Sequence, residues 1–303
     1  MFLVLCFAVV LALHIATGGA RVMRSPVPRV RRGHLKILSL NACVLASGLG
    51  FTSDDRKDAR LAAILDMAAD YDVVLLQEVW GARWSSRHTE FYAAALQLGF
   101  DVVHTSAGLF LDSGNVILSR VPVLSASSHI FAASAGWQRL LPNAILHACL
   151  EPIEGRRLNV FTTHLHTDTV PYASALNAGA VATRAAQVAE LASYRAATAE
   201  GPWLVAGDLN IPGGSAEYDS AASELGQQSL LSPTFPATYD CDSFLAPPGW
   251  RTGDPGVAAF KERSCVDHVF TNVPMAFAFV KRQACPPSDH RPLEVGLSLE
   301  NPR

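Results

Sequence analysis

The sequence predicts a single α/β or two-sheet domain of roughly 250–300 residues. Half of the 303 residues are hydrophobic, which is ample for one large core. Short apolar runs, typical of strands buried on both faces, alternate with stretches whose apolar residues have helical spacing. Several of the apolar runs end in polar residues, as strands do in enzymes that gather a site at the edge of a sheet.

The predicted elements follow one another along the chain. Strands are expected at residues 35–41, 72–76, 115–119, 144–150, 158–163, 203–206, 265–270 and 293–299. Helices are expected at residues 54–69, 89–98 and 180–197. In the first helix Leu61, Ile64 and Leu65 share one face, and the third is rich in alanine, the strongest helix former. Since no internal repeat interrupts the series, residues 35–300 are interpreted as one domain.

The first twenty residues differ from the rest of the chain. Residues 2–16 are almost wholly apolar, and Gly18 and Ala20 supply the small residues of a cleavage site. A run of about 15 apolar residues suits the core of a signal peptide better than a membrane span. We therefore expect residues 1–20 to be a signal peptide or an N-terminal anchor. No Lys or Arg precedes the run, so the uncleaved anchor stays open.

A secreted or extracytoplasmic protein, with possible anchoring through its N-terminus, is the localisation that this segment predicts. Residues 21–34 are rich in Arg, Pro and Val and show neither a helical nor a strand period. They are interpreted as a linker between the N-terminal segment and the domain.

The charge composition restricts the partners. Charged residues make up 17% of the chain and the net charge is −3, which excludes a disordered chain and a broad basic face for nucleic acid. Nucleic acid is therefore disfavoured as a substrate, although acidic nucleases remain an alternative. A substrate with one phosphate would not need a basic face. Nothing in the composition implies a protein partner.

Six cysteines are present, one of them in the N-terminal segment. In an oxidising compartment one or two disulfides are expected. Cys241, Cys265 and Cys285 crowd the C-terminal part and are the preferred candidates, whereas Cys149 lies in an apolar run and is expected to be a buried thiol. The absence of a Cys-x-x-Cys pattern disfavours a zinc or redox site.

Polar residues gather at or near the ends of the predicted strands. The set is Asn41, Glu78, His164, His166, Asp208, Asn210, Asp267, His268, Asp289 and His290. Its four carboxylates come from separate segments and would repel one another if gathered without a cation. Oxygen-rich ligands suit a hard ion such as Mg²⁺ or Mn²⁺. Taken singly, each motif also fits an ordinary turn, helix cap or packed histidine pair, so the prediction depends on the combination.

This ordered combination resembles the endonuclease/exonuclease/phosphatase (DNase I-like) superfamily. The matching segments are Ser-Leu-Asn at 39–41, Leu-Gln-Glu-Val-Trp at 76–80, Ser-Gly-Asn-Val-Ile-Leu-Ser-Arg at 113–120, Thr-His-Leu-His at 163–166, Gly-Asp-Leu-Asn at 207–210, Val-Asp-His-Val-Phe at 266–270 and Ser-Asp-His at 288–290. They cover nearly the whole chain after residue 34. The resemblance implies a four-layer α/β/β/α sandwich, in which two packed mixed β-sheets are flanked by helices.

Within the superfamily the sequence is most similar to neutral sphingomyelinases. Glu-Val-Trp at 78–80, the histidine and Gly-Asp-Leu-Asn segments, and the spacing of Arg184, Gln187 and Glu190 carry that similarity. It implies a Mg²⁺-dependent phosphodiesterase that hydrolyses a phospholipid at a membrane surface, sphingomyelin to ceramide and phosphocholine. One departure concerns the headgroup, because the Lys-Gly pair common in these enzymes is replaced by Leu-Pro-Asn-Ala at 141–144.

Two alternatives stand beside this function. One is a secreted DNase I-like nuclease or another phosphoester hydrolase of the same superfamily. The other is a catalytically inactive binding protein on the same fold, which the intact set of carboxylates and histidines argues against.

The resemblance, joined to the chemistry, assigns the metal ligands. Glu78 is expected to be the principal Mg²⁺ ligand, with Asn41 beside it and Asp289 near the metal or its waters. The metal, for which Mn²⁺ could substitute, would polarise a phosphoryl oxygen and neutralise charge in the transition state.

The resemblance also assigns the catalytic residues. His290 is the expected general base, since an imidazole has a pKa near the working pH, and Asp267 would orient it. Asp208 and Asn210 would position the water and the phosphate. His164 would contact the phosphate and help the leaving oxygen depart.

His166 and Asn115 are the expected substrate-binding residues, with a turn residue before a strand as the alternative for Asn115. Trp80, Trp84 and Phe110 are candidates for a lipid-facing rim, because aromatic side chains suit the membrane interface. Ordinary packing is the alternative for each of the three.

Overall fold

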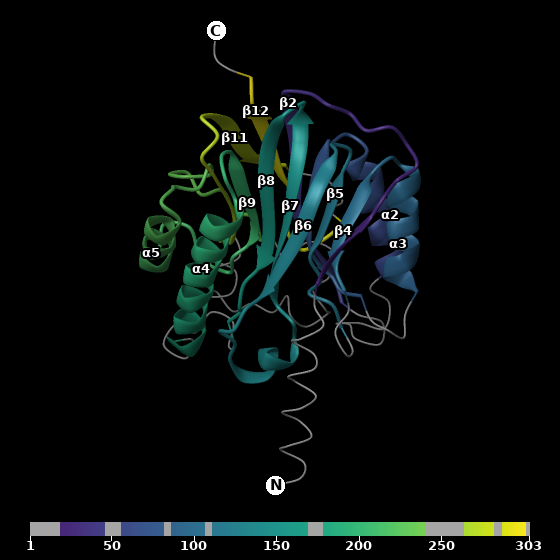
Figure 1. The fold of residues 1–303 in the computed structure, drawn as a ribbon. Helices are drawn as coiled ribbons and strands as arrows, with labels where there is room; N and C mark the ends of the chain where they lie inside the picture. The colour runs from purple at the N-terminus through teal and green to yellow at the C-terminus, as the bar shows by residue number, and fades with distance from the viewer. Residues whose placement is uncertain are drawn as a thin grey trace.

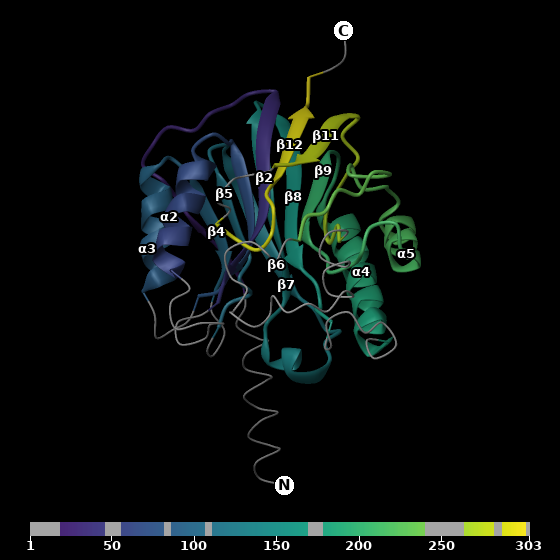
Figure 2. The same cartoon turned by 180° about the vertical axis from the view of Figure 1, so that it is seen from behind.

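The computed structural model describes residues 19–45, 56–81, 86–106, 111–168, 178–239, 264–281 and 287–300. Within these ranges two β-sheets pack face to face, and helices cover their outer faces (Figures 1 and 2). The expected four-layer α/β/β/α sandwich is confirmed.

The seven-stranded sheet has the strand order β1-β4-β5-β3-β2-β12-β11. Its strands are β1 (Ala20–Met23), β2 (His34–Val44), β3 (Val73–Val79), β4 (Asp101–Thr105), β5 (Val116–Ser119), β11 (Met275–Val280) and β12 (Leu293–Ser298). Helices α2 (Lys57–Ala68) and α3 (Arg87–Gln97) cover its outer face. Strands β2 and β3 are parallel, whereas their other neighbours run antiparallel.

The five-stranded sheet has the strand order β10-β9-β8-β7-β6. Its strands are β6 (Val123–Ile130), β7 (Ala144–Ile153), β8 (Arg156–His164), β9 (Trp203–Asp208) and β10 (Asp267–Thr271). Helices α4 (Ala178–Thr198) and α5 (Ala216–Leu225) cover its outer face, and a short 3₁₀ helix, η1 (Gly136–Leu140), lies between β6 and β7. Strands β8 and β9 form the parallel pair of this sheet.

Strand alternation divides the apolar residues among three cores. On β2, Leu38 and Leu40 face α2 and α3, whereas Leu35 and Ile37 face the second sheet. Successive side chains of a strand point to opposite faces, so a strand buried on both sides contributes to two cores at once. This explains why the predicted strands are apolar along their whole length.

The sequence analysis found the central strands and three helices but missed β1, β4, β6, β11 and α5. The outer strand β6 reads Val-Leu-Ser-Ala-Ser-Ser-His-Ile and is half exposed, so it lacks the apolar run on which the prediction depends. Edge strands obtain their order from backbone pairing with a neighbour, which leaves little trace in the side-chain pattern.

The interpretation of residues 21–34 as a linker is wrong at its start. Residues Ala20–Met23 pair antiparallel with β4 as the edge strand of the larger sheet. Arg24 and Arg29 then bind the buried Asp101, with guanidinium nitrogens 2.9 Å and 3.0 Å from its Oδ2. This segment is therefore attached to the domain by main-chain pairing and by charge, and Val22 and Met23 also pack against the cores.

Two predictions about single side chains also change. Trp80 is buried against Leu45, Leu111 and Leu141, so it does not form an exposed rim. Trp84 and Phe110 lie outside the described residues. Cys265 is a free, buried thiol, which contradicts its assignment as a disulfide candidate.

One of the other cysteine predictions is confirmed, and two lie outside the described residues. Cys149 is a buried free thiol, as expected, and Cys43 is another. Cys241 and Cys285 lie outside the described residues, as do residues 1–18. None of the helices in the described ranges is both long and apolar enough to cross a bilayer.

Gly207 tests the close packing of β8 on β9. A methyl group at this position would lie 2.1 Å from the carbonyl oxygen of Thr163, so the two strands would have to separate. We expect Gly207→Ala to lower the free energy of unfolding in urea by at least about 2 kcal/mol. The control is Gly179→Ala in α4, where the added methyl meets nothing within 4 Å. It should be neutral or stabilising by up to about 1 kcal/mol; equal effects of both substitutions would contradict this account.

Candidate active site

The candidate site is built by polar residues that continue the apolar rows of the central core. Along β8 the inward row Leu158, Val160 and Thr162 ends in His164, and along β9 Leu204 and Ala206 are followed by Asp208. The same period of two brings Asn41 of β2 and Asp267 of β10 to the inner faces. All four lie at one end of the sandwich, where the two sheets meet.

Glu78 reaches this cluster through an unusual backbone conformation. Its neighbour Gln77 already points inward and donates to Thr162 of β8 at 2.8 Å, so regular alternation would turn Glu78 outward. Glu78 has a φ of 55°, in the left-handed region. Such a conformation costs about 1–3 kcal/mol in a non-glycine residue and is concentrated at functional sites.

Gly114 and Asp112 hold the chain around Glu78. A methyl group on Gly114, which has a φ of 71°, would lie 3.2 Å from the Glu78 Cα and 3.1 Å from the Trp80 ring. The Oδ1 atom of Asp112 accepts hydrogen bonds from the N–H groups of Gly81 and Gly114, both at 2.9 Å. These contacts hold the backbone around Glu78 in place.

Asn41 joins the carboxylates from the two sheets. Its Nδ2 donates to Glu78 Oε1 at 2.8 Å and to Asp208 Oδ2 at 3.0 Å. Its Oδ1 accepts from the N–H of Cys43 at 3.0 Å. The amide therefore offsets the repulsion between two carboxylates that lie close together. Direct ligation by Asn41, which needs the amide oxygen, stays a prediction.

His164 lies between the same two carboxylates. Its Nδ1 is 3.8 Å from Glu78 Oε1, and its Nε2 is 3.6 Å from Asp208 Oδ2. Both distances exceed those of a hydrogen bond. Among the described residues neither ring nitrogen has a hydrogen-bond partner, although the ring is buried. These nitrogens are available to a ligand that enters the cluster.

His290 and Asp267 form a hydrogen-bonded pair, with 2.8 Å between Nδ1 and Oδ2. Burial alone would lower the pKa of His290, but the carboxylates of Asp267 and Asp208 outweigh it and raise that pKa well above its usual value. Burial would raise the pKa of Asp267, yet His290 and Thr238 hold it below its usual value. The pair therefore favours an imidazolium beside a carboxylate.

The arrangement fits a divalent cation. Glu78, His164 and Asp208 each offer one ligand atom, and these atoms lie within 4.8 Å of one another. Asp208, Asp267 and His290 form a second such group. Carboxylates that converge from two sheets, Asp208 and Asp267 buried and Glu78 half-buried, need a positive charge. The nitrogens of His164, which have no partner among the described residues, are available to a cation or to the phosphate that it would bind.

Two further expected residues border the cluster. The N–H of Asn210 donates to Asp208 Oδ1 at 2.9 Å, and its Nδ2 donates to the carbonyl of Leu165 at 3.1 Å. Asp289 is half-buried and belongs to neither group of converging ligand atoms. The neighbouring Ser288 donates to the carbonyl of Asn41 at 2.6 Å, which ties this segment to β2.

The remaining expected residues are Asn115 and His166. The Nδ2 of Asn115 donates to the carbonyl of Ala144 at 2.7 Å, and its Oδ1 is buried without a partner in the described part of the chain. Burial, followed by the charge of Arg184, lowers the pKa of His166. Substrate binding by Asn115 and His166 stays a prediction.

His268 has a structural position. Its Nε2 donates to the carbonyl of Ile211 at 2.8 Å, and its ring packs on Tyr218 and Phe270. Burial lowers its pKa, which favours the neutral ring. It supports the strand that carries Asp267.

Thr238 was missed by the sequence analysis. Its Oγ1 accepts from the N–H groups of Val266 and Asp267, and its hydroxyl stabilises the Asp267 carboxylate. Thr238 precedes no predicted strand and belongs to no recognised motif, so only the three-dimensional arrangement reveals its contact with Asp267.

A sequence profile of the Endonuclease/Exonuclease/phosphatase family matches residues 38–290. The chain belongs to this family. The match includes every strand and loop that contributes to the cluster. As a member of the endonuclease/exonuclease/phosphatase family, the protein is a phosphoester hydrolase of the DNase I-like superfamily. A search of curated protein sequences found no match.

Solved structures share the fold at low sequence identity. Sphingomyelinase C from Streptomyces griseocarneus has a TM-score of 0.64 and 19% identity over 88% of this chain and 100% of that chain. A beta toxin mutant from Staphylococcus aureus with bound magnesium ions has a TM-score of 0.64 and 17% identity over 87% of this chain and 99% of that chain. TDP2 from D. rerio, complexed with a single-strand DNA product, has a TM-score of 0.59 and 16% identity over 88% of this chain and 99% of that chain. At these identities the likeness establishes the DNase I-like fold.

The contribution of Asp112, which holds the segment around Glu78, to the stability of the fold depends on pH. Burial raises the pKa of Asp112 from 3.8 to about 7, although the N–H groups of Gly81 and Gly114 act to lower it. Between these values the folded protein binds more protons than the unfolded chain, so stability falls as the pH rises from about 4 to about 7. Asp112→Asn keeps an acceptor for both N–H groups and removes the titration.

We expect the unfolding free energy of Asp112→Asn to rise relative to wild type across this pH window. The difference could reach about 4 kcal/mol, because one pKa unit corresponds to about 1.4 kcal/mol. Urea unfolding of both proteins at several pH values measures it. A constant difference over the window would show that the Asp112 carboxyl does not titrate there.

Proposed function

We propose that the protein is a Mg²⁺-dependent phosphodiesterase that hydrolyses sphingomyelin to ceramide and phosphocholine. The observation that carries the hydrolase chemistry is the meeting of Glu78, His164 and Asp208 with the Asp267–His290 pair at one end of both sheets. The choice of lipid is supported by the motifs shared with neutral sphingomyelinases and by the shared fold with sphingomyelinase C. Mn²⁺ is expected to substitute for Mg²⁺.

The metal would be held by Glu78, with Asp208 and Asn41 beside it. When bound, it would supply positive charge at the phosphate and stabilise the transition state. The oxygen-rich donors of the cluster fit Mg²⁺ better than a soft metal.

With a cation bound beside Asp208, which would disfavour the imidazolium, neutral His290 would take the proton of the attacking water at Nε2. Its Nδ1 is engaged by Asp267, which fixes the tautomer and leaves Nε2 free, 3.6 Å from Asp208 Oδ2. The carboxylates of Asp267 and Asp208 stabilise the imidazolium that results. Asp208 and Asn210 would orient the water, and His164 would donate to the phosphate or to the leaving oxygen.

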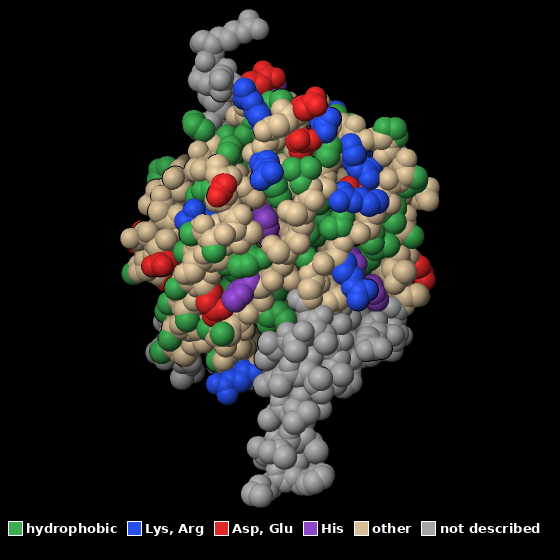
Figure 3. All heavy atoms as spheres, viewed as in Figure 1, with side chains coloured by type: hydrophobic (Ala, Val, Ile, Leu, Met, Phe, Trp, Pro, Cys, Tyr) green, Lys and Arg blue, Asp and Glu red, His purple; other side chains and the backbone are tan. Residues whose placement is uncertain are grey.

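Nuclease activity is the second candidate function. TDP2 from D. rerio shares the fold and is complexed with a DNA product. The net charge of −3 gives this candidate less support, and basic and acidic side chains are interspersed on the described part of the face drawn in Figure 3. A phosphate backbone is usually bound by a basic face.

We further propose an extracytoplasmic enzyme in which residues 2–16, when retained, hold the site at a membrane. Ala20 pairs with Thr105 of β4. The adjacent line of paired residues crosses the sheet from Arg21 to Leu40, which precedes Asn41; the strands between them contribute His104, Val116 and Leu76. Ala20 is therefore level with the end of the sheet that carries Asn41. Three strand spacings place it roughly 14 Å from β3.

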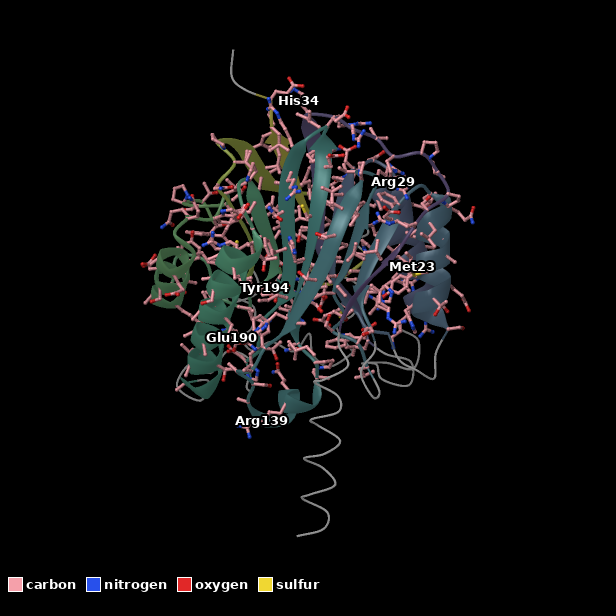
Figure 4. The ribbon with its side chains drawn as sticks, viewed as in Figure 1. Met23, Arg29, His34, Arg139, Glu190 and Tyr194 are labelled. Carbon is pink, nitrogen blue, oxygen red and sulfur yellow. The ribbon has the colours of Figure 1, made fainter. Side chains whose placement is uncertain are left out.

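Figure 4 lets the reader follow this course along the side of the molecule. From His34 through Arg29 to Met23 the chain runs successively closer to the end that carries the site. An anchor joined to β1 would therefore leave the domain beside the candidate catalytic cluster. This placement would present the site to phospholipid in the same membrane.

The substrate test uses purified protein with Mg²⁺ and, in parallel, sphingomyelin vesicles, plasmid DNA and an inositol polyphosphate. We expect phosphocholine release only. Glu78→Gln and His290→Ala should lower that rate by about 10²–10⁴-fold, because each removes a group that acts on the phosphate or the water. The control His34→Ala, whose exposed ring pairs with Glu300 at the other end of β2 from Asn41, should retain wild-type turnover. Nicked plasmid without phosphocholine release would overturn the lipid assignment.

The anchor test compares the full chain with a variant that lacks residues 2–18. Deletion should abolish co-sedimentation with sphingomyelin vesicles and lower vesicle hydrolysis by at least about tenfold, since tethering raises the local concentration of the lipid. Hydrolysis of a water-soluble phosphodiester should be unchanged. Equal vesicle binding by both proteins, or a wild-type N-terminus that begins after residue 16, would refute the anchor.

A further inference from the structure

The position of His164 depends on the main chain that follows it. Its ring nitrogens have no hydrogen-bond partner in the described part of the chain, so no side-chain contact of that kind holds the imidazole between Glu78 and Asp208. Residues 165–167 leave β8 directly after His164 and belong to no regular element. His164 itself pairs with Asp208 of β9, so whatever orders these three residues restrains His164 on the side where the chain leaves the sheet.

All six backbone polar groups of residues 165–167 have partners. The N–H of Leu165 donates to the carbonyl of Asp208 at 3.0 Å, which continues the pairing of β8 with β9. Side chains satisfy the other five groups. The carbonyl of Leu165 accepts from Asn210, the N–H of His166 donates to Gln187, the carbonyl of His166 accepts from Arg184, and both groups of Thr167 bond to Gln138.

Two of these side chains come from one face of α4. Arg184 is buried and donates to the carbonyl of His166 at 3.1 Å while it pairs with Asp168 and Glu217. Gln187, one helical turn further, is fully buried and accepts from the N–H of His166 at 2.8 Å. The remaining bonds of Arg184 hold acidic side chains, whereas both bonds of the Gln187 amide are made to backbone groups.

Gln187 also binds the segment between β6 and β7. Its Nε2 donates to the carbonyl of Ala133 at 2.9 Å, and Glu190 accepts from the N–H groups of Ala132 and Ala133. Figure 4 shows Glu190 and Tyr194 on α4 and Arg139 at the tip of the segment below them. From this segment Gln138 of η1 reaches Thr167, with Nε2 2.7 Å from Oγ1.

We propose that Gln187 is a positioning residue for His164 and that Gln138 holds the same backbone segment through Thr167. The two amides act as a template for residues 165–167, because each amide uses both its donor and its acceptor on groups that must keep one relative position. His164 then projects from a backbone that cannot adjust independently. The role of Gln187 rests on the proposed function, since His164 is the group that would contact the phosphate.

The template predicts a specific kinetic effect. A contact that strengthens in the transition state changes kcat, and a misplacement of about 1 Å can cost as much as 10²-fold. Gln187→Met keeps the length of the side chain and its helix propensity but removes both hydrogen bonds. We expect it to lower kcat by about 10–100-fold and to leave KM within about twofold, with a soluble phosphodiester, bis(p-nitrophenyl) phosphate, as substrate and Mg²⁺ present.

Tyr194→Phe is the matched control. Tyr194 lies on the same helix, two turns beyond Gln187, and loses a hydrogen bond to Ser127 Oγ of 2.6 Å that is remote from His164. It should leave kcat at the wild-type value. A second variant, Gln138→Met, removes the contact to Thr167 from the opposite side and keeps the proposal testable if Gln187→Met fails to fold.

A double-mutant cycle separates positioning from a general loss of structure. In the His164→Ala background Gln187→Met should change kcat by less than about twofold, because the group that it positions is absent. The same 10–100-fold loss in both backgrounds, or no loss in either, would overturn the proposal.

A readout independent of turnover distinguishes this proposal from the proposed function. The ¹H–¹³C NMR signal of the His164 ring should shift in Gln187→Met and not in Tyr194→Phe. A wild-type protein that cleaves no phosphodiester would refute the proposed function, and the shift would then decide the positioning role alone. An unchanged His164 signal in a folded Gln187→Met protein would refute that role.

Discussion

Repulsion among buried carboxylates is the constraint on which the candidate site depends. Glu78 and Asp208 approach from different sheets, and Asn41 donates to both while Asp267 is held by His290. One amide and one imidazolium offset only part of this negative charge. A divalent cation would complete the balance, and the charge that would stabilise the cluster is also the charge that would assist hydrolysis of a phosphate ester.

Much of the site could be predicted from the sequence, because the central strands are apolar until the polar residue at their ends. His164 and Asp208 follow from that pattern, and the shared inner face then follows from alternation. Glu78 could be recognised as part of a motif, but its left-handed backbone could not, because that conformation depends on the close approach of Gly114. The edge strands β1 and β6 were missed because main-chain pairing orders them.

The supporting residues were the least predictable part. Thr238, Gln138 and Gln187 act on backbone or carboxylate groups far away in the sequence, and their residue types occur anywhere on protein surfaces. The spacing of Gln187 with Arg184 marked a similarity to known enzymes but not a contact. Burial distinguishes them, because a buried polar group that lacks a hydrogen-bond partner costs free energy.

The central claim is that Glu78 and Asp208 hold a divalent cation between the sheets. Crystals soaked in Mn²⁺ test it most directly, because anomalous scattering locates that ion without assumptions about activity. The account predicts a peak within about 2.5 Å of the Glu78 carboxylate, on the side that faces Asp208 and His164. A map with no peak at this end of the sandwich, or with the ion held by other residues, would contradict it.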